Sequence, residues 1–118
     1  MLKPDDFRRI ALSMTDAIEN AHMGHPDFRA NGRIFATLAP DNKQGMVKLT
    51  PAQQVGYVRE YPGTFVPAKG AWGLQGCTMV QLKSADKETV GQAMTLAWQN
   101  TVRQKSVKKS AAKRSKRN

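Results

Sequence analysis

The stretch GTFVPAKGAWGLQGCTMVQL, from Gly63 to Leu82, decides how the rest of the chain is arranged. The apolar pair Phe65-Val66 and the alternating run over residues 78–82 are typical of two strands that pair as a ribbon. Between them lies a glycine-rich segment that also holds Lys69 and Trp72. Because glycine permits tight turns and close backbone approach, we expect a wide loop with Trp72 near its tip.

Trp72 has two possible roles in this ribbon. Its neighbours Ala71 and Gly73 are too small to cover an indole ring, so the side chain either folds back over the sheet edge or is presented to a partner. Large aromatic side chains usually find a hydrophobic seat, which favours the first alternative. The second alternative would place Lys69 against a phosphate and Trp72 against a sugar or base face.

The segment before this ribbon predicts further strands. Asn31-Gly32 is a strong signal for a two-residue hairpin turn, and apolar residues alternate on both sides of it over residues 27–38. Residues 45–49 form a third alternating run, and residues 17–23 indicate an edge strand. These strands are joined by short connections, which is the pattern of an antiparallel sheet.

Three helices are indicated by their start signals and apolar spacing. The first begins at Pro4, the second has Thr50 as N-cap, and the third has Asp86 as N-cap and runs to about Lys105. Their expected buried faces hold, in order, Phe7, Ile10, Ala11 and Met14; Val55, Val58 and Tyr61; and Val90, Ala93, Met94, Ala97, Trp98 and Val102. The fold class is therefore α+β: one antiparallel sheet with two ribbons, or wings, covered by an N-terminal and a long C-terminal helix.

Charge divides the chain into a body and a tail. Of 19 basic residues, eight lie after Asn100 with no acidic residue among them, whereas residues 1–100 are nearly neutral at 11 basic against 9 acidic. Such a segment buries too little apolar surface to order itself, so we expect a folded domain over residues 1–102 and a disordered basic tail over 103–118. Polyanions are the expected partners of the tail.

Several chemical classes receive little support. The sequence has no apolar run long enough for a membrane span and no signal-peptide core, so we expect a cytoplasmic protein. His22, His25 and Asp27 have metal-ligand chemistry, but His22 and His25 would point to opposite faces of one extended strand. Cys77 lacks the sequence signature of a catalytic nucleophile. The glycines of residues 70–76 are expected to precede a strand, whereas the glycines of a phosphate-binding loop precede a helix. We expect no enzyme activity, no cofactor and no metal.

Four segments together resemble the MmcQ/YjbR family of small bacterial proteins. They are HPDFRANGRIFATL over residues 25–38, GMVKLTPAQQ over 45–54, FVPAKGAWGLQG over 65–76, and the helix over 86–100 that ends in AWQN. The resemblance covers about residues 3–100 and leaves the tail outside. It implies a double-wing α/β fold and a role in DNA binding, although a fold on its own does not establish a function.

The main functional prediction is weakly sequence-specific nucleic-acid binding by a monomer, with DNA favoured over RNA. The alternatives are a small-ligand or regulatory binding domain and a protein-interaction module. The predicted contact residues are basic side chains at the two ribbon tips and in the tail, together with one aromatic: Arg29, Arg33, Lys69, Trp72, Arg103, Lys105, Lys108, Lys109, Lys113, Arg114, Lys116 and Arg117.

Overall fold

A computed structural model describes residues 2–22 and 24–117, with the side chains of residues 2–21 and 24–103. Its centre is a six-stranded sheet in the order β1-β2-β3-β4-β6-β5, and each pair of neighbours is antiparallel. The strands are β1 (Ile18–His22), β2 (His25–Ala30), β3 (Arg33–Leu38), β4 (Gln44–Lys48), β5 (Phe65–Pro67) and β6 (Cys77–Gln81). The α+β prediction is confirmed.

The hairpin between β2 and β3 follows the predicted turn. Asn31 and Gly32 both have positive φ, 55° and 77°, which is the conformation that a two-residue turn of this kind requires. The register then shifts by one residue between Phe28 and Arg29. The shift leaves Phe35 and Ala36 both fully buried, so β3 places two successive side chains in the core.

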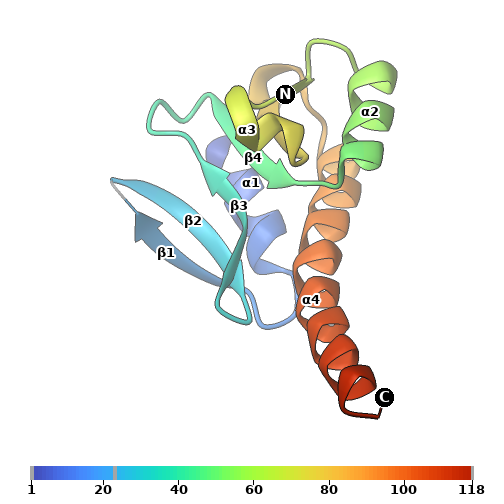
Figure 1. The fold of residues 1–118 in the computed structure, drawn as a ribbon. Helices are drawn as coiled ribbons and strands as arrows, with labels where there is room; N and C mark the ends of the chain where they lie inside the picture. Colours follow the sequence, from blue (N-terminus) through green and yellow to red (C-terminus); the bar gives the residue numbers. More distant parts are fainter. Residues whose placement is uncertain (1, 23, 118) are drawn as a thin grey trace.

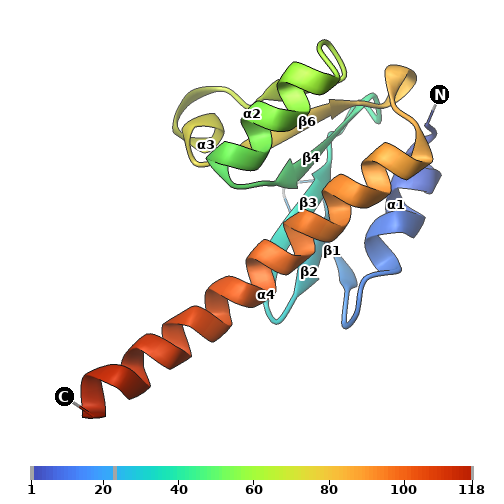
Figure 2. The same ribbon diagram turned by 90° about the vertical axis from the view of Figure 1, so that its right-hand side faces the viewer.

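Two helices cover one face of the sheet (Figure 2). They are α1 (Pro4–Leu12) and α4 (Lys87–Arg117), which lie side by side across the strands. The core between helices and sheet is built from Phe7, Phe28, Phe35, Val47, Phe65, Val80, Val90 and Met94, all fully buried. Burial of this apolar surface is the main stabilising contribution to the fold.

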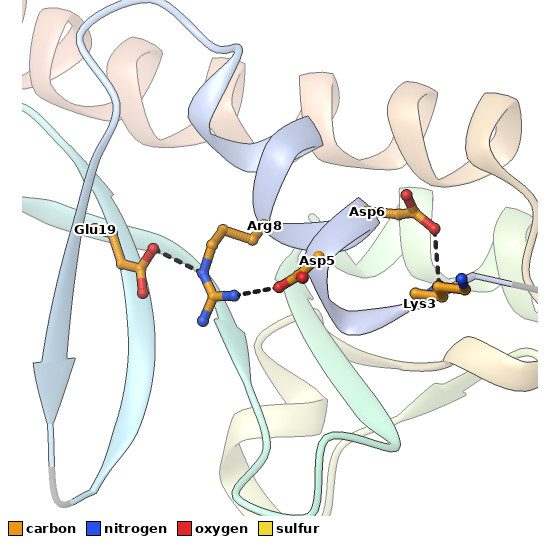
Figure 3. Close-up of polar contacts among 5 residues, drawn as sticks. All are labelled: Lys3, Asp5, Asp6, Arg8 and Glu19. Carbon is orange, nitrogen blue, oxygen red and sulfur yellow. Dashed lines mark hydrogen bonds and ion pairs between the residues drawn. The ribbon is translucent and has the colours of Figure 1, made fainter.

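Charged groups fasten α1 to the edge of the sheet (Figure 3). The Arg8 guanidinium donates to Asp5 at 2.7 Å and to Glu19 of β1 at 2.9 Å. At the start of α1 the backbone N–H of Lys3 donates to the Asp6 carboxylate at 3.0 Å, and this bond is the main reason that the pKa of Asp6 is lowered. The helix start expected at Pro4 is confirmed.

Two shorter helices lie beside β4 and β6, away from the β1–β2 hairpin (Figures 1 and 2). They are α2 (Pro51–Glu60) and α3 (Gly70–Leu74), and a single 3-10 turn, η1 (Leu82–Ser84), leads into α4. The predicted pairing of the ribbon is confirmed, because β5 and β6 are antiparallel neighbours. Its tip, however, is the helix α3 and not the wide loop that the glycines suggested.

Three further expectations are corrected. On α2, Val55 is 53% exposed, because Gln54 takes the inward position and Val55 therefore faces solvent. Trp98 lies at the rim of the core, partly buried, with its indole N–H donating to the Thr15 carbonyl at 2.9 Å. The helix α4 runs past Lys105, where the pattern placed its end.

The tail prediction is not tested by this helix. The side chains of residues 104–117 and the whole of Asn118 lie outside the described part of the chain, so a disordered tail over residues 103–118 stays a prediction. Among the helices that the structure describes, none is both long and apolar enough to cross a lipid bilayer.

Candidate nucleic-acid interface

Trp72 projects from the short helix α3 at the tip of the ribbon. Its side chain is 63% exposed, and Leu74 on the same helix is 83% exposed. Gly70 opens the helix with φ of 69°, which a glycine adopts without strain. The favoured expectation, that Trp72 folds back over the sheet edge, is therefore wrong: the indole is presented to solvent.

Hydrogen bonds from Gln54 of α2 fix the position of α3. Its side-chain amide is 8% exposed and donates to the carbonyls of Gly73 and Cys77, each at 3.0 Å, and to the Thr78 hydroxyl at 3.2 Å. The Thr78 hydroxyl in turn donates to the Gly76 carbonyl at 2.8 Å. One glutamine of α2 thus satisfies polar groups of both α3 and β6, and it fixes the base from which Trp72 projects.

Two glycines allow this close packing. A Cβ at position 73 would collide with the backbone carbonyl of Ala68, and one at position 76 would collide with that of Leu49. Gly76 also has φ of 111°, a value that side chains rarely tolerate. Glycine at 73 and 76 therefore serves tight seating of α3 against the neighbouring strands and does not make the segment flexible.

A groove of about 960 Å³ opens beside the exposed indole. Its polar and aromatic wall is formed by Lys48 from β4, Gln53 from α2, Trp72 and Gln75, and Asn100 and Arg103 from α4. The described residues that line it include two cations and no carboxylate. A groove with this composition attracts anions.

Asn100 braces the wall of the groove. Its side-chain amide donates to the Lys48 carbonyl at 3.1 Å and to Gln53 Oε1 at 2.8 Å. Thr50 is the N-cap of α2, as predicted, and Gln53 completes a capping box with it: the Thr50 N–H donates to Gln53 Oε1 and the Gln53 N–H donates to Thr50 Oγ1. The positive end of the α2 dipole therefore lies at the groove and adds to the charges of Lys48 and Arg103.

Cys77 lies beneath this region and is 5% exposed. Burial raises the pKa of its thiol, and the nearby charge of Lys48 opposes that shift only in part. A nucleophilic cysteine needs a lowered pKa to supply thiolate at neutral pH. The surroundings of Cys77 favour the neutral thiol, as expected of a structural residue.

Three of the predicted contact residues, Lys69, Trp72 and Arg103, meet near the tip of the ribbon. Lys69 and Trp72 line a second hollow, of about 340 Å³, that lies on the sheet face opposite α1 and α4. Arg103 joins Trp72 from the other side, in the groove. These three side chains surround the tip of the ribbon, as the second role considered for Trp72 requires.

The hairpin arginines lie elsewhere. Arg33 follows the β2–β3 turn, which is distant from α3 in both views (Figures 1 and 2). Arg29 donates to the two carboxylate oxygens of Asp27 at 2.8 and 3.2 Å, and this hydrogen bonding raises the pKa of the guanidinium. Because Asp27 is 1% exposed, the pair is largely neutralised within the fold. The remaining predicted contacts, from Lys105 to Arg117, have side chains outside the described residues.

The histidine motif is arranged differently from the expectation. His22 and His25 are register partners across β1 and β2, so the argument that they point to opposite faces of one strand is wrong. Asp27 is bonded to Arg29. Among the side chains that the structure describes, those of residues 2–21 and 24–103, no cluster of three histidine, cysteine or acidic groups is placed to hold a metal ion.

Sequence reasoning missed the groove residues Lys48 and Asn100, and it missed Gln54, which supports α3. For Lys48 a signal was present, because the alternation of GMVKL puts Lys48 on the face opposite the buried Val47. For Gln54 and Asn100 the sequence held no such signal, since their hydrogen-bond partners are 19 or more positions away in the chain.

The fold and groove define a small α+β protein with an exposed aromatic side chain set among cations. The model of the YjbR family matches residues 12–100, and the chain belongs to that family. A crystal structure of the Deinococcus radiodurans protein DR2400, described by the domain DUF419, shares the fold with a TM-score of 0.71 at 16% identity, over 83% of this chain and 77% of that one. No curated protein matches the sequence.

Proposed function

We propose that this protein binds nucleic acid with weak sequence specificity and that its folded body takes part through the groove beside Trp72. The observation that carries the proposal is the 63% exposed indole standing between two cation-bearing hollows whose described lining holds no carboxylate. In this proposal Lys48, Lys69 and Arg103 contact phosphates, and Trp72 lies against a sugar or base face.

The basic tail adds the larger electrostatic contribution in this proposal. Seven basic residues follow Arg103, and phosphate contacts of this kind do not depend on base sequence. The tail therefore raises affinity for any polyanion, whereas the groove orients the chain on it. We propose DNA as the favoured partner, a monomer as the binding unit, the cytoplasm as the compartment and no catalytic step.

A small anionic ligand is the second candidate function. The groove volume of about 960 Å³ lies within the range of small-molecule sites, which is ~300–1,000 Å³. Such a ligand would be held by the same cations and indole. Binding of a single nucleoside monophosphate as tight as that of an oligonucleotide would favour this alternative.

The test is fluorescence anisotropy of a labelled 12-nucleotide single strand, its duplex and the matching RNA, titrated with the full chain at low salt. We expect Lys48→Glu to weaken binding about five- to tenfold more than Lys83→Glu does. Lys83 is a matched control, because it is exposed and follows the end of β6 opposite to the end that pairs with Lys48.

Two outcomes would count against the proposal. If Lys48→Glu and Lys83→Glu lowered the affinity equally, binding would depend only on net charge and the groove would have no role. Equal effects of Trp72→Ala and Leu74→Ala would remove the indole from the interface, since Leu74 is even more exposed on the same helix but lines neither hollow.

A further inference from the structure

The face of the sheet opposite α1 and α4 carries one row of side chains across all six strands. The register pairs Asn20 with Asp27, Asp27 with Thr37, Thr37 with Met46, Met46 with Met79, and Met79 with Val66. Cross-strand partners point to the same face of a sheet. The row is polar towards β1 and apolar towards β5.

Two apolar members of this row, Met46 and Met79, form the floor of the second hollow. Met46 and Met79 are directly opposite each other on β4 and β6, and both are only partly buried. Trp72 and Lys69 stand at one side of the hollow, and His25 and Thr37 at the other. At about 340 Å³ the hollow is at the small end of the range for ligand sites, so it suits one ring system.

Three polar groups of the hollow are not used by the part of the fold that the structure describes. The Thr37 hydroxyl, the His25 imidazole and the Lys69 ammonium form no hydrogen bond to any residue in the described part of the chain. An apolar floor with a few convergent donors and acceptors is the usual composition of a site for a flat heteroaromatic ring. Methionine side chains also make favourable contacts with aromatic rings.

We propose that this hollow binds one unpaired nucleobase, so that the partner is a single-stranded nucleic acid. The occupant is indicated by charge, because the indole of Trp72 also lines the groove that holds Lys48 and Arg103. A strand with phosphates in that groove and an adjacent base on Met46 and Met79 would use both hollows. A paired base is stacked within a duplex and does not reach the hollow. This inference rests on the proposed function.

The test compares a twelve-residue oligothymidylate with a strand of the same length whose sugars carry no bases. Both strands present the same phosphates to the tail, so the tail contributes equally to the two affinities. We expect the full chain to bind the oligothymidylate about tenfold more tightly, and Trp72→Ala to abolish most of that difference. The wild-type comparison needs no variant to fold.

Methyl resonances locate the base. The methionine methyl groups are labelled with carbon-13, and the ring current of a bound base should shift the methyl resonances of Met46 and Met79. The methyl resonances of Met14 and Met94 serve as controls, because these side chains pack in or against the core. The strand without bases should leave Met46 and Met79 unmoved.

Each result has one consequence. Equal affinity for the two strands, or unshifted Met46 and Met79 while the oligothymidylate binds, would overturn the base site and leave the proposed function standing. Absence of binding to either strand at low salt would overturn the proposed function, and the base site with it.

Discussion

The side-chain amide of Gln54 donates a 3.0 Å hydrogen bond to the carbonyl of Gly73, and this bond joins α2 to the helix that carries Trp72. Replacement of Gln54 by Ala would remove the side-chain donor from the carbonyls of Gly73 and Cys77, which would keep only their backbone donors, the N–H groups of Gly76 and Ala68. We expect the free energy of unfolding to fall by about 1–3 kcal/mol, which urea denaturation would measure.

Gln99→Ala is the control for that change. Gln99 is exposed on α4, and its replacement should alter stability by less than about 0.5 kcal/mol. If Gln54→Ala were as mild as Gln99→Ala, then α3 would be held by other contacts. The indole should also become more accessible in Gln54→Ala, seen as stronger acrylamide quenching of Trp72.

Two glycines in helices should respond in opposite directions to alanine. At Gly73 a Cβ would collide with the Ala68 carbonyl, so Gly73→Ala should destabilise the fold by about 1–3 kcal/mol. At Gly91 in α4 a Cβ meets nothing within 4 Å, so Gly91→Ala should stabilise it by about 0.5–1 kcal/mol. Thermal melts of the two variants compare them directly, and destabilisation of equal size would contradict the packing described for α3.

Asp86 should make stability depend on pH in acid. Its carboxylate accepts from the Thr89 N–H at 2.8 Å and from the Thr89 hydroxyl at 3.0 Å, and these bonds lower its pKa below the ordinary value of 3.8. The folded chain therefore binds fewer protons here than the unfolded chain does. The stabilisation is complete above about pH 3.8 and is lost as the pH falls through the lower folded value.

Two substitutions separate the charge of Asp86 from its hydrogen bonds. Asp86→Ala should lower the melting temperature at pH 7, and part of that difference from wild type should disappear as the pH falls through the lowered pKa of Asp86. Asp86→Asn keeps an acceptor at the N-cap, so it should stay closer to wild type at pH 7 and lack this acid dependence. A deficit for Asp86→Ala that is unchanged down to pH 2 would argue against the lowered pKa.

The tail should control how binding responds to salt. A chain that ends at Arg103 keeps twelve basic residues against nine acidic ones, a formal charge of +3 compared with +10 for the full chain. Each phosphate contact contributes about −0.9 to the slope of log affinity against log salt concentration, so the full chain should show roughly −4 to −7. The slope for the shortened chain should fall to that of one to three phosphate contacts. Its melting temperature should be unchanged. A full slope in the shortened chain would contradict the role given to the tail.

The fold was largely predictable because its signals are local. The Asn31-Gly32 turn, the Thr50 N-cap and the Asp86 N-cap each depend on residues within four positions of one another, and the structure confirms all three. Alternating apolar residues then place the strands. No distant contact is needed to read any of these elements.

The site was less predictable because it depends on distant contacts. The helix α3 occupies the glycine-rich tip, where propensity favoured a loop, and it is held by Gln54 from another helix. Burial of Gln54 also turns Val55 outward, against the expected apolar stripe. The exposure of Trp72 follows from this packing, so the general preference of large aromatic side chains for a hydrophobic seat favoured the wrong alternative.

The most direct measurement is the emission of Trp72 in a Trp98→Phe background, which leaves one indole in the chain. Trp98 donates to the Thr15 carbonyl, so the melting temperature of this background must first be compared with that of wild type. A single-stranded oligonucleotide should quench Trp72 in step with the anisotropy signal, because a base stacks on the indole, whereas heparin should bind the tail without quenching. Unchanged emission at saturating oligonucleotide would contradict the account and assign all nucleic-acid contact to the tail.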